Sequence, residues 1–209
     1  MERIGAGIRV LPYGDRALLA EVDDAGAVAA VRRALEAAPL PGQRELVPAA
    51  RTVLVVLDRP PTDLDAAALR RLPLHDDGPE GAAPSVSLPV VFDGPDLTEV
   101  ADLVGRTAPE LVAALTGARL TVAFSGFAPG FGYLTGLPPE LHVPRRATPR
   151  TRVPAGAVAL AGPYAGVYPR SSPGGWQLVG RTDAVLFDVD RVPPALLVPG
   201  ARVRFREVG

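Results

Sequence analysis

The spacing of apolar residues in the first third of the chain predicts a small unit of mixed strands and helices. An apolar stripe at helical spacing predicts a helix over 25–38, with Asp24 as its N-cap. Asp63 predicts the cap of a second helix over 64–72. Strands are predicted over three apolar runs, at 17–22, 46–50 and 52–57. The order strand, helix, strand, strand, helix is typical of a split βαββα unit, with the sheet on one side and the helices on the other.

The remainder of the chain predicts short strands joined by tight turns. Two short helices are expected over 97–104 and 111–115, the second begun by a capping box of Thr107 and Glu110. Strands are predicted at 85–92, 120–124, 153–161, 166–168, 176–180, 185–187 and 203–205. Many short strands with Gly and Pro turns favour a closed barrel. The predicted fold class is therefore α+β, with a split βαββα unit followed by a β-barrel.

A polar segment rich in Gly and Pro, HDDGPEGAAP at 75–84, is the best candidate for a linker between these parts. We therefore expect a small α/β domain over 1–84 and a barrel domain over 85–209. His75 is expected to be an exposed residue of the linker.

Composition excludes several classes of function. The 209-residue chain has a net charge of −1, which argues against a general nucleic-acid binder. It has no Cys, so a thiolate nucleophile, disulfides and Cys-ligated zinc are excluded. Two distant histidines exclude a multi-His metal site, although one His with carboxylates stays possible; we expect no metal on this chain. No apolar run approaches the ~20 residues that span a bilayer, and no signal core is present, so a soluble cytoplasmic protein is expected.

Charge is unevenly distributed along the chain. Between Glu110 and Asp183 there are seven arginines and one carboxylate, Glu140, which gives this stretch a net charge of +6. All 22 basic residues are Arg, so a single Arg is weak support for a binding role. The shortage of carboxylates is the stronger sign, and it indicates an anionic ligand or an acidic partner.

Three sequence blocks in this basic stretch could form a binding site. In FAPGFGYL (127–134), Pro129-Gly130 suits a turn with positive φ at Gly, and the aromatics would wall a pocket, with Phe124 and Phe131 as core residues. In PRRATPRTRVPAG (144–156), prolines hold four arginines that could clamp a carboxylate or phosphate. In SSPGGWQLVG (171–180), paired glycines permit a close backbone approach. Trp176 either stacks on a ligand or fills the barrel, the second being favoured.

General acid–base candidates in the second domain are few: Glu140, His142 and the tyrosines. No Ser-His-Asp pattern and no paired carboxylates occur there. The absence of Lys excludes a P-loop. This set favours a binding module, or a subunit that completes an active site at an interface.

These blocks resemble a family whose members are variously called the B subunit of 5-oxoprolinase, carboxyltransferase subunit or allophanate hydrolase subunit 1, and kinase A inhibitor. The resembling segments are GFAPGFGYLTGLP, LHVPRRATPRTRVPAGAVALAG, GVYPRSSPGGWQLVGRT and PALLVPGARVRF, with a weaker match in RVLPYGDRALLAEV. The resemblance implies a cyclophilin-like β-barrel for the second domain and a small α/β domain for the first. Many members carry a His where this chain has Thr116.

The resemblance implies one component of an ATP-dependent 5-oxoprolinase, which opens the cyclic amide 5-oxoproline to glutamate while ATP is hydrolysed to ADP and phosphate. It implies two partners, a homologous barrel protein (the C subunit) and a separate A subunit. It also implies ATP with Mg²⁺ as co-substrate and no activity of this chain alone. Carried onto this sequence, the candidate catalytic residue is His142. The implied substrate and ATP-binding residues are Phe127, Pro129, Gly130, Tyr133, Arg145, Arg146, Arg150, Tyr168, Gly174, Gly175, Trp176 and Gln177.

The family name also implies an alternative function. The chain could inhibit a sensor histidine kinase by blocking its autophosphorylation, with the apolar and basic face of the barrel against an acidic helical bundle. Prolyl isomerisation rests on fold analogy alone. A role as biotin carrier is excluded, because the chain has no Lys to carry biotin.

Overall fold

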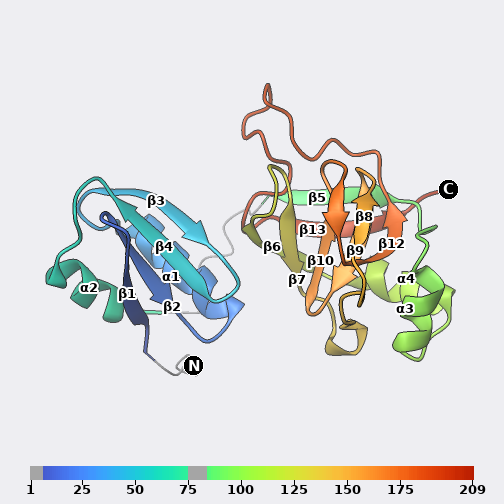
Figure 1. Ribbon diagram of the computed structural model, residues 1–209, viewed down its shortest axis with the longest axis horizontal. Helices are drawn as coiled ribbons and strands as arrows, with labels where there is room; N and C mark the ends of the chain where they lie inside the picture. The colour runs from blue at the N-terminus through green and yellow to red at the C-terminus, as the bar shows by residue number, and fades with distance from the viewer. Residues whose placement is uncertain (1–6, 75–83) are drawn as a thin grey trace. The chain divides into compact units, whose positions relative to one another are not determined.

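The computed structural model describes residues 7–74 and 84–209. The chain divides into two compact units, 1–82 and 83–209, each described here by itself (Figure 1). The predicted linker, including His75, lies outside the described residues apart from Pro84.

The first unit is a four-stranded antiparallel sheet with two helices. Its elements are β1 (Arg9–Tyr13), β2 (Ala17–Glu21), α1 (Ala25–Ala37), β3 (Gln43–Pro48), β4 (Thr52–Leu57) and α2 (Asp63–Arg70). The strand order is β1-β2-β4-β3, so the predicted unit gains one strand, β1, paired with β2. Side chains of a strand alternate between its faces. Val53 and Val55 of β4 therefore share one face, and they belong to the same buried cluster as Val31 and Leu35 of α1.

Local capping decides where the two helices of this unit begin. The Asp24 carboxylate accepts a hydrogen bond of 2.8 Å from the Ala27 amide, which confirms the predicted cap of α1. The predicted cap of α2 was wrong by one residue. Thr62 is the N-cap and forms a reciprocal capping box with Asp65, whereas Asp63 lies exposed in the first turn. Two Asp residues in that turn made the sequence ambiguous.

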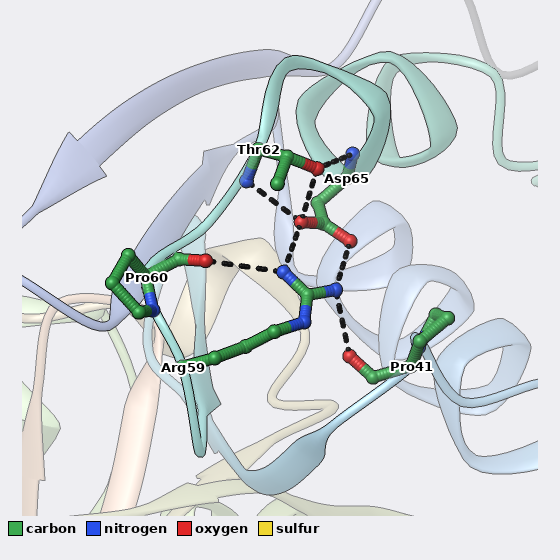
Figure 2. A network of polar contacts seen from close by, with 5 residues as sticks. All are labelled: Pro41, Arg59, Pro60, Thr62 and Asp65. Carbon is green, nitrogen blue, oxygen red and sulfur yellow. Dashed lines mark hydrogen bonds and ion pairs between the residues drawn. The ribbon is translucent and has the colours of Figure 1, made fainter.

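A partly buried ion pair between Arg59 and Asp65 fixes the start of α2 (Figure 2). Arg59 donates two hydrogen bonds to the Asp65 carboxylate, at 2.7 and 2.9 Å. The same guanidinium donates to the carbonyls of Pro60 and Pro41, so it joins the helix to the loop before β3. The hydrogen bond from Arg59 outweighs burial and holds the pKa of Asp65 well below its ordinary value.

The second unit is a seven-stranded barrel with the strand order β12-β9-β10-β7-β6-β13-β5. Its ring closes where Val91, directly after β5, exchanges two backbone hydrogen bonds of 2.9 Å with Arg181 of β12. Its elements are β5 (Ser85–Val90), α3 (Leu97–Leu103), α4 (Ala108–Gly117), β6 (Leu120–Ser125), β7 (Gly132–Thr135), η1 (Pro139–Leu141), β8 (Arg150–Val153), β9 (Ala157–Ala161), β10 (Tyr164–Val167), β11 (Ser172–Gly174), β12 (Gln177–Arg181) and β13 (Arg202–Glu207). The predicted α+β class with a barrel is confirmed.

The barrel has one apolar cluster inside and a second on its outer face. The inner cluster receives residues from all seven strands, together with Val100 of α3 and Leu115 of α4. Successive residues of β9 contribute to the two clusters in turn: Val158 and Leu160 belong to the inner cluster, and Ala159 belongs to the outer one. The separate two-stranded ribbon of β8 and β11 packs on the outer cluster, through Val153 of β8 and through Gly174 of β11 against Tyr168. This outer face carries the predicted aromatic site residues Tyr133, Tyr168 and Trp176, and Phe127 contacts it.

Three predictions for the barrel need correction. The predicted strand over 153–161 is two strands, because β8 ends at Val153 and a turn at 155–156 comes before β9, which begins at Ala157. Residues 185–187 form no strand, and only Phe187 makes an isolated bridge, with Ala195. Trp176 fills the outer cluster rather than the barrel interior. The sequence pattern also missed β7 as a strand, because Gly132 and the adjacent turn hide the alternation of Tyr133 and Leu134.

Candidate functional site

An aromatic cluster covers the outer face of the barrel. Phe131 lies at its centre, with its ring centroid 5.0 to 5.5 Å from the rings of Tyr133, Phe127, Tyr168 and Trp176. All four contacts are edge-to-face, the arrangement that aromatic quadrupoles favour. The members of the aromatic cluster are Phe124, Phe127, Phe131, Tyr133, Tyr164, Tyr168 and Trp176. The structure therefore brings together the four predicted aromatic site residues, Phe127, Tyr133, Tyr168 and Trp176.

Phe127 is the exposed member of this cluster. It has a φ of +65°, a left-handed conformation that is costly for a bulky side chain, and its side chain is 57% exposed. Its ring still meets Tyr168 edge-on at 5.9 Å. The turn continues through Pro129 to Gly130, whose φ of +85° confirms the predicted turn. This turn holds an apolar ring in solvent above buried aromatics, which is a geometry suited to contact with a ligand or partner.

Tyr168 is buried where the β8–β11 ribbon covers the barrel. A Cβ at Gly174 would overlap the hydroxyl oxygen of Tyr168, so only glycine lets β11 lie this close to the ring. Burial raises the pKa of Tyr168 above its ordinary value, and the nearby positive charge of Arg145 opposes that shift in part. The phenol therefore stays neutral and serves as a rigid wall of the site.

The arginine-rich loop 144–150 is held by one buried carboxylate. Asp96, whose side chain is 3% exposed, accepts from Arg146 at 2.8 Å and from Arg150 at 2.6 Å. Its second oxygen accepts from the backbone amide of Leu178 at 2.7 Å. Two of the guanidiniums expected to clamp an anion, those of Arg146 and Arg150, are therefore already paired with an internal carboxylate.

Other carboxylates neutralise more of the basic stretch. Arg181 pairs with Asp93 at 2.9 Å, and Arg146 also lies 3.6 Å from Glu99. These acidic residues precede the stretch in sequence, so counting charges along the chain overstated the local positive charge. Burial raises the pKa of Asp96, but the bonds from Arg150 and Leu178 and the charges of both arginines outweigh it, and the pKa is lowered. Asp96 stays ionised.

Arg145 is the arginine of this loop that keeps its side chain available. It is exposed, and within 7–74 and 84–209 its guanidinium has no ion pair and no hydrogen bond. The backbone of its neighbour Arg146 is also held in place, because the Arg146 backbone amide donates a hydrogen bond of 2.8 Å to the Gly175 carbonyl. That bond joins the PRRATPR block to the SPGGWQ block.

Gln177 lies buried at the same junction. Its side-chain amide donates to the Pro144 carbonyl at 3.4 Å. Its carbonyl oxygen has no partner in the described structure, nor has Nη1 of Arg150. Nε of Arg146 is also without a partner, so three buried polar atoms at this junction are unsatisfied, which is a costly state that an ordered water or a small conformational change would relieve.

The remaining candidates lie apart from this junction. His142 is exposed after η1, with its Nε2 3.2 Å from the Leu137 carbonyl, and no bond joins it to the aromatic cluster among the described residues. The hydroxyl of Thr116 donates to the Val112 carbonyl within α4. In the described part of the chain, no group of three His, Asp or Glu could hold a metal ion. No described helix is long and apolar enough to cross a membrane.

Asp96 was missed by the sequence analysis. It lies 50 and 54 residues before its arginine partners, and its only local signal is a position before α3, where its side chain caps nothing.

Comparison with known families identifies this architecture. The model of the carboxyltransferase domain, subdomains C and D, matches residues 8–197. The chain belongs to this family. It is similar to the 5-oxoprolinase B subunit of Escherichia coli O157:H7, with 40% identity over 92% of each chain. It is also similar to the 5-oxoprolinase B subunit of Bacillus subtilis, with 33% identity over 98% of this chain and 91% of the relative.

A solved structure shows the same fold within a longer chain. The crystal structure of TTHA0988 matches with a TM-score of 0.76 and 36% identity over 93% of this chain. The match spans 40% of the TTHA0988 chain, so the present chain corresponds to less than half of that protein.

Proposed function

We propose that this chain is the B subunit of an ATP-dependent 5-oxoprolinase and acts in the cytoplasm with a homologous barrel protein, the C subunit, and a separate A subunit. The observation that carries the proposal is the similarity to proteins named as the B subunit of 5-oxoprolinase over almost the whole of both chains. The site geometry supports it, since the exposed guanidinium of Arg145 is close enough for its charge to act on Tyr168, whose ring meets exposed Phe127.

The substrate has features that fit this surface. 5-Oxoproline is a small five-membered lactam with one carboxylate. In the proposal, Arg145 binds that carboxylate through charge-assisted hydrogen bonds, and Phe127 contacts the apolar ring atoms. Asp96 holds Arg146 and Arg150 so that the loop carrying Arg145 keeps its position. This chain then binds and orients the lactam.

The chemical step needs groups from other chains. In the chemical step, phosphoryl transfer from ATP to the amide oxygen releases ADP and activates the amide carbon. Water then adds to this carbon, the C–N bond breaks as the nitrogen takes up a proton, and a second water releases phosphate from the resulting acyl phosphate to give glutamate. Among the described residues of the site, Asp96 is ion-paired and no carboxylate or histidine is placed to activate the first water. We therefore assign the general base to a companion chain. It follows that this chain alone should not hydrolyse 5-oxoproline.

The same reasoning applies to ATP. The described site offers one free guanidinium for a phosphate and no group of carboxylates for Mg²⁺. We therefore place most of the Mg²⁺–ATP contacts on companion chains, with Arg145 as the residue of this chain that could reach a phosphate or the substrate carboxylate.

The test is ATP hydrolysis by the co-expressed complex, with and without 5-oxoproline, and with this chain omitted. We expect ADP and glutamate to form in equal amounts only when 5-oxoproline and this chain are both present. Equal activity without this chain, or an assembled complex that shows no dependence on 5-oxoproline, contradicts the proposal. Inhibition of histidine kinase autophosphorylation by this chain alone would favour the alternative function.

A further inference from the structure

The segment between β12 and β13 presents apolar side chains to solvent. Val185, Phe187, Val189 and Val192 are all exposed, from 38% for Phe187 to 96% for Val192. We call residues 183–195 the apolar loop. Figure 1 shows it as the long loop between β12 and β13 that rises away from the strands of the barrel. Four exposed apolar side chains in one short segment form a patch, and such patches mark interaction sites.

The apolar loop is held in one conformation by its own bonds. The Arg191 guanidinium donates to the carbonyls of Val185, Leu186 and Pro194, at 3.1, 3.2 and 2.8 Å. The Leu196 amide donates to the Leu186 carbonyl at 2.9 Å. A preformed loop loses little conformational entropy on binding. Its apolar side chains are therefore ready to be covered by another surface.

The apolar loop is continuous with the candidate site. A Cβ at Gly130 would lie 2.7 Å from Cβ of Phe187, so the loop packs directly on the turn that carries Phe127. A chain docked on the loop would also reach exposed Phe127 and the edge of the aromatic cluster. Such docking would supply groups that the site of this chain lacks.

The charge around the patch defines the partner. Asp183, Asp188 and Asp190 are exposed in the apolar loop, while the guanidinium of Arg191 is bonded to loop carbonyls. A complementary face would be apolar with a basic rim. In TTHA0988 the matching region is 40% of a longer chain, so there this fold is covalently joined to further polypeptide.

We propose that the apolar loop is the docking surface for one companion chain of the 5-oxoprolinase complex, the homologous barrel protein (C subunit), through an apolar face with a basic rim. This inference rests on the proposed function, because the companion chain exists only if the protein is part of a 5-oxoprolinase complex. The companion is the single occupant proposed, and a second copy of this chain is the competing outcome.

The test uses the double variant Val189→Glu with Val192→Glu. Both side chains are largely exposed, so the isolated chain should unfold at the same denaturant concentration as the wild type. We expect the dissociation constant for the companion chain, measured by calorimetry, to rise at least ~100-fold, because two charges would be buried in an apolar interface. The control is Leu64→Glu, which changes a similarly exposed apolar residue of the first unit and should leave binding unchanged.

The outcomes separate this inference from the proposed function. Unchanged binding of the double variant, or no binding by the wild type, overturns the docking proposal. Self-association of the wild type that the double variant loses would assign the loop to a second copy and overturn it as well. If the wild type binds, the variant does not, and the complex never consumes 5-oxoproline, the docking surface stands while the proposed function fails.

Discussion

At the scale of single residues, Asp96 limits what the arginine-rich loop can bind. A carboxylate with three hydrogen bonds from two guanidiniums and an amide has few free lone pairs and stays ionised. An external anion would have to displace it in order to engage the same faces of Arg146 and Arg150. Those two residues therefore act on a ligand through the position of the loop, and Arg145 is the residue that can touch it.

Replacing Asp96 tests this structural role. We expect Asp96→Asn to lower the free energy of unfolding of the barrel by about 2–3 kcal/mol, because two half-buried guanidiniums lose their counter-charge. Trp176 is the only Trp and lies in the barrel, so its fluorescence during urea unfolding reports this unit. Asp93→Asn is the matched control. It breaks the exposed pair with Arg181 and should cost below about 1 kcal/mol. Equal effects of the two changes would contradict the role given to Asp96.

Replacing Arg145 tests the binding role. Loss of a charge-assisted hydrogen bond weakens binding by about 1.5–3 kcal/mol, so we expect Arg145→Ala to raise KM for 5-oxoproline roughly 10- to 100-fold in the assembled complex. Because Arg145 is exposed and unpaired among the described residues, the unfolding curve should not change. Arg119→Ala, another exposed arginine of the barrel unit, is the control and should leave KM as it is. A KM unaffected by Arg145→Ala would remove this residue from the site.

At the scale of elements, α2 depends on the charge of one side chain. Asp65 has a folded pKa lowered by its bonds with Arg59, so its contribution to stability is present above its ordinary pKa near 4 and is lost as the pH falls toward the folded value. We expect Asp65→Asn to lower the unfolding temperature near pH 7. The difference from the wild type should shrink as the pH falls below about 4. Thermal unfolding followed by circular dichroism at several pH values measures both.

The control for this experiment is Asp63→Asn, two residues earlier in the same turn. Asp63 is exposed, so its change should have a small effect at every pH. A pH-independent loss of stability in Asp65→Asn would mean that the hydrogen bonds from the Thr62 amide and hydroxyl to the side chain of residue 65, rather than the ion pair with Arg59, carry the effect.

Elements whose signals are local in sequence could be predicted, and those that depend on distant contacts could not. The Asp24 cap and the box of Thr107 with Glu110 need only neighbours within three residues, and both are confirmed. The pairing of Asp96 with Arg150 crosses 54 residues and leaves no periodic trace. The sequence showed which aromatic residues could belong to the site. It could not show that they all lie on the outer face, because that depends on the side of the barrel wall against which each ring packs.

At the scale of the whole molecule, the sequence predicted the class of both units because burial alternates along their strands. Strand β4 alternates in every position, and β13 alternates from Arg202 to Phe205. The closure of the barrel through Val91 and Arg181 could not be predicted, since it depends on backbone pairing after the end of β5. The apolar loop was hidden for a similar reason, because its 185–187 run has the composition of a strand.

The barrel unit has its own cores, and this predicts that it folds alone. Its inner and outer clusters consist of residues from 86 onward, while the cluster of the first unit ends at Leu74. We expect residues 83–209 to unfold cooperatively in urea, with a Trp176 fluorescence midpoint close to that of the full chain. Asp96→Asn should lower the midpoint by the same amount in both, because its partners all lie in the barrel. A fragment without a cooperative transition, or one in which Asp96→Asn has a different effect, would show that the first unit is needed to stabilise the arginine loop.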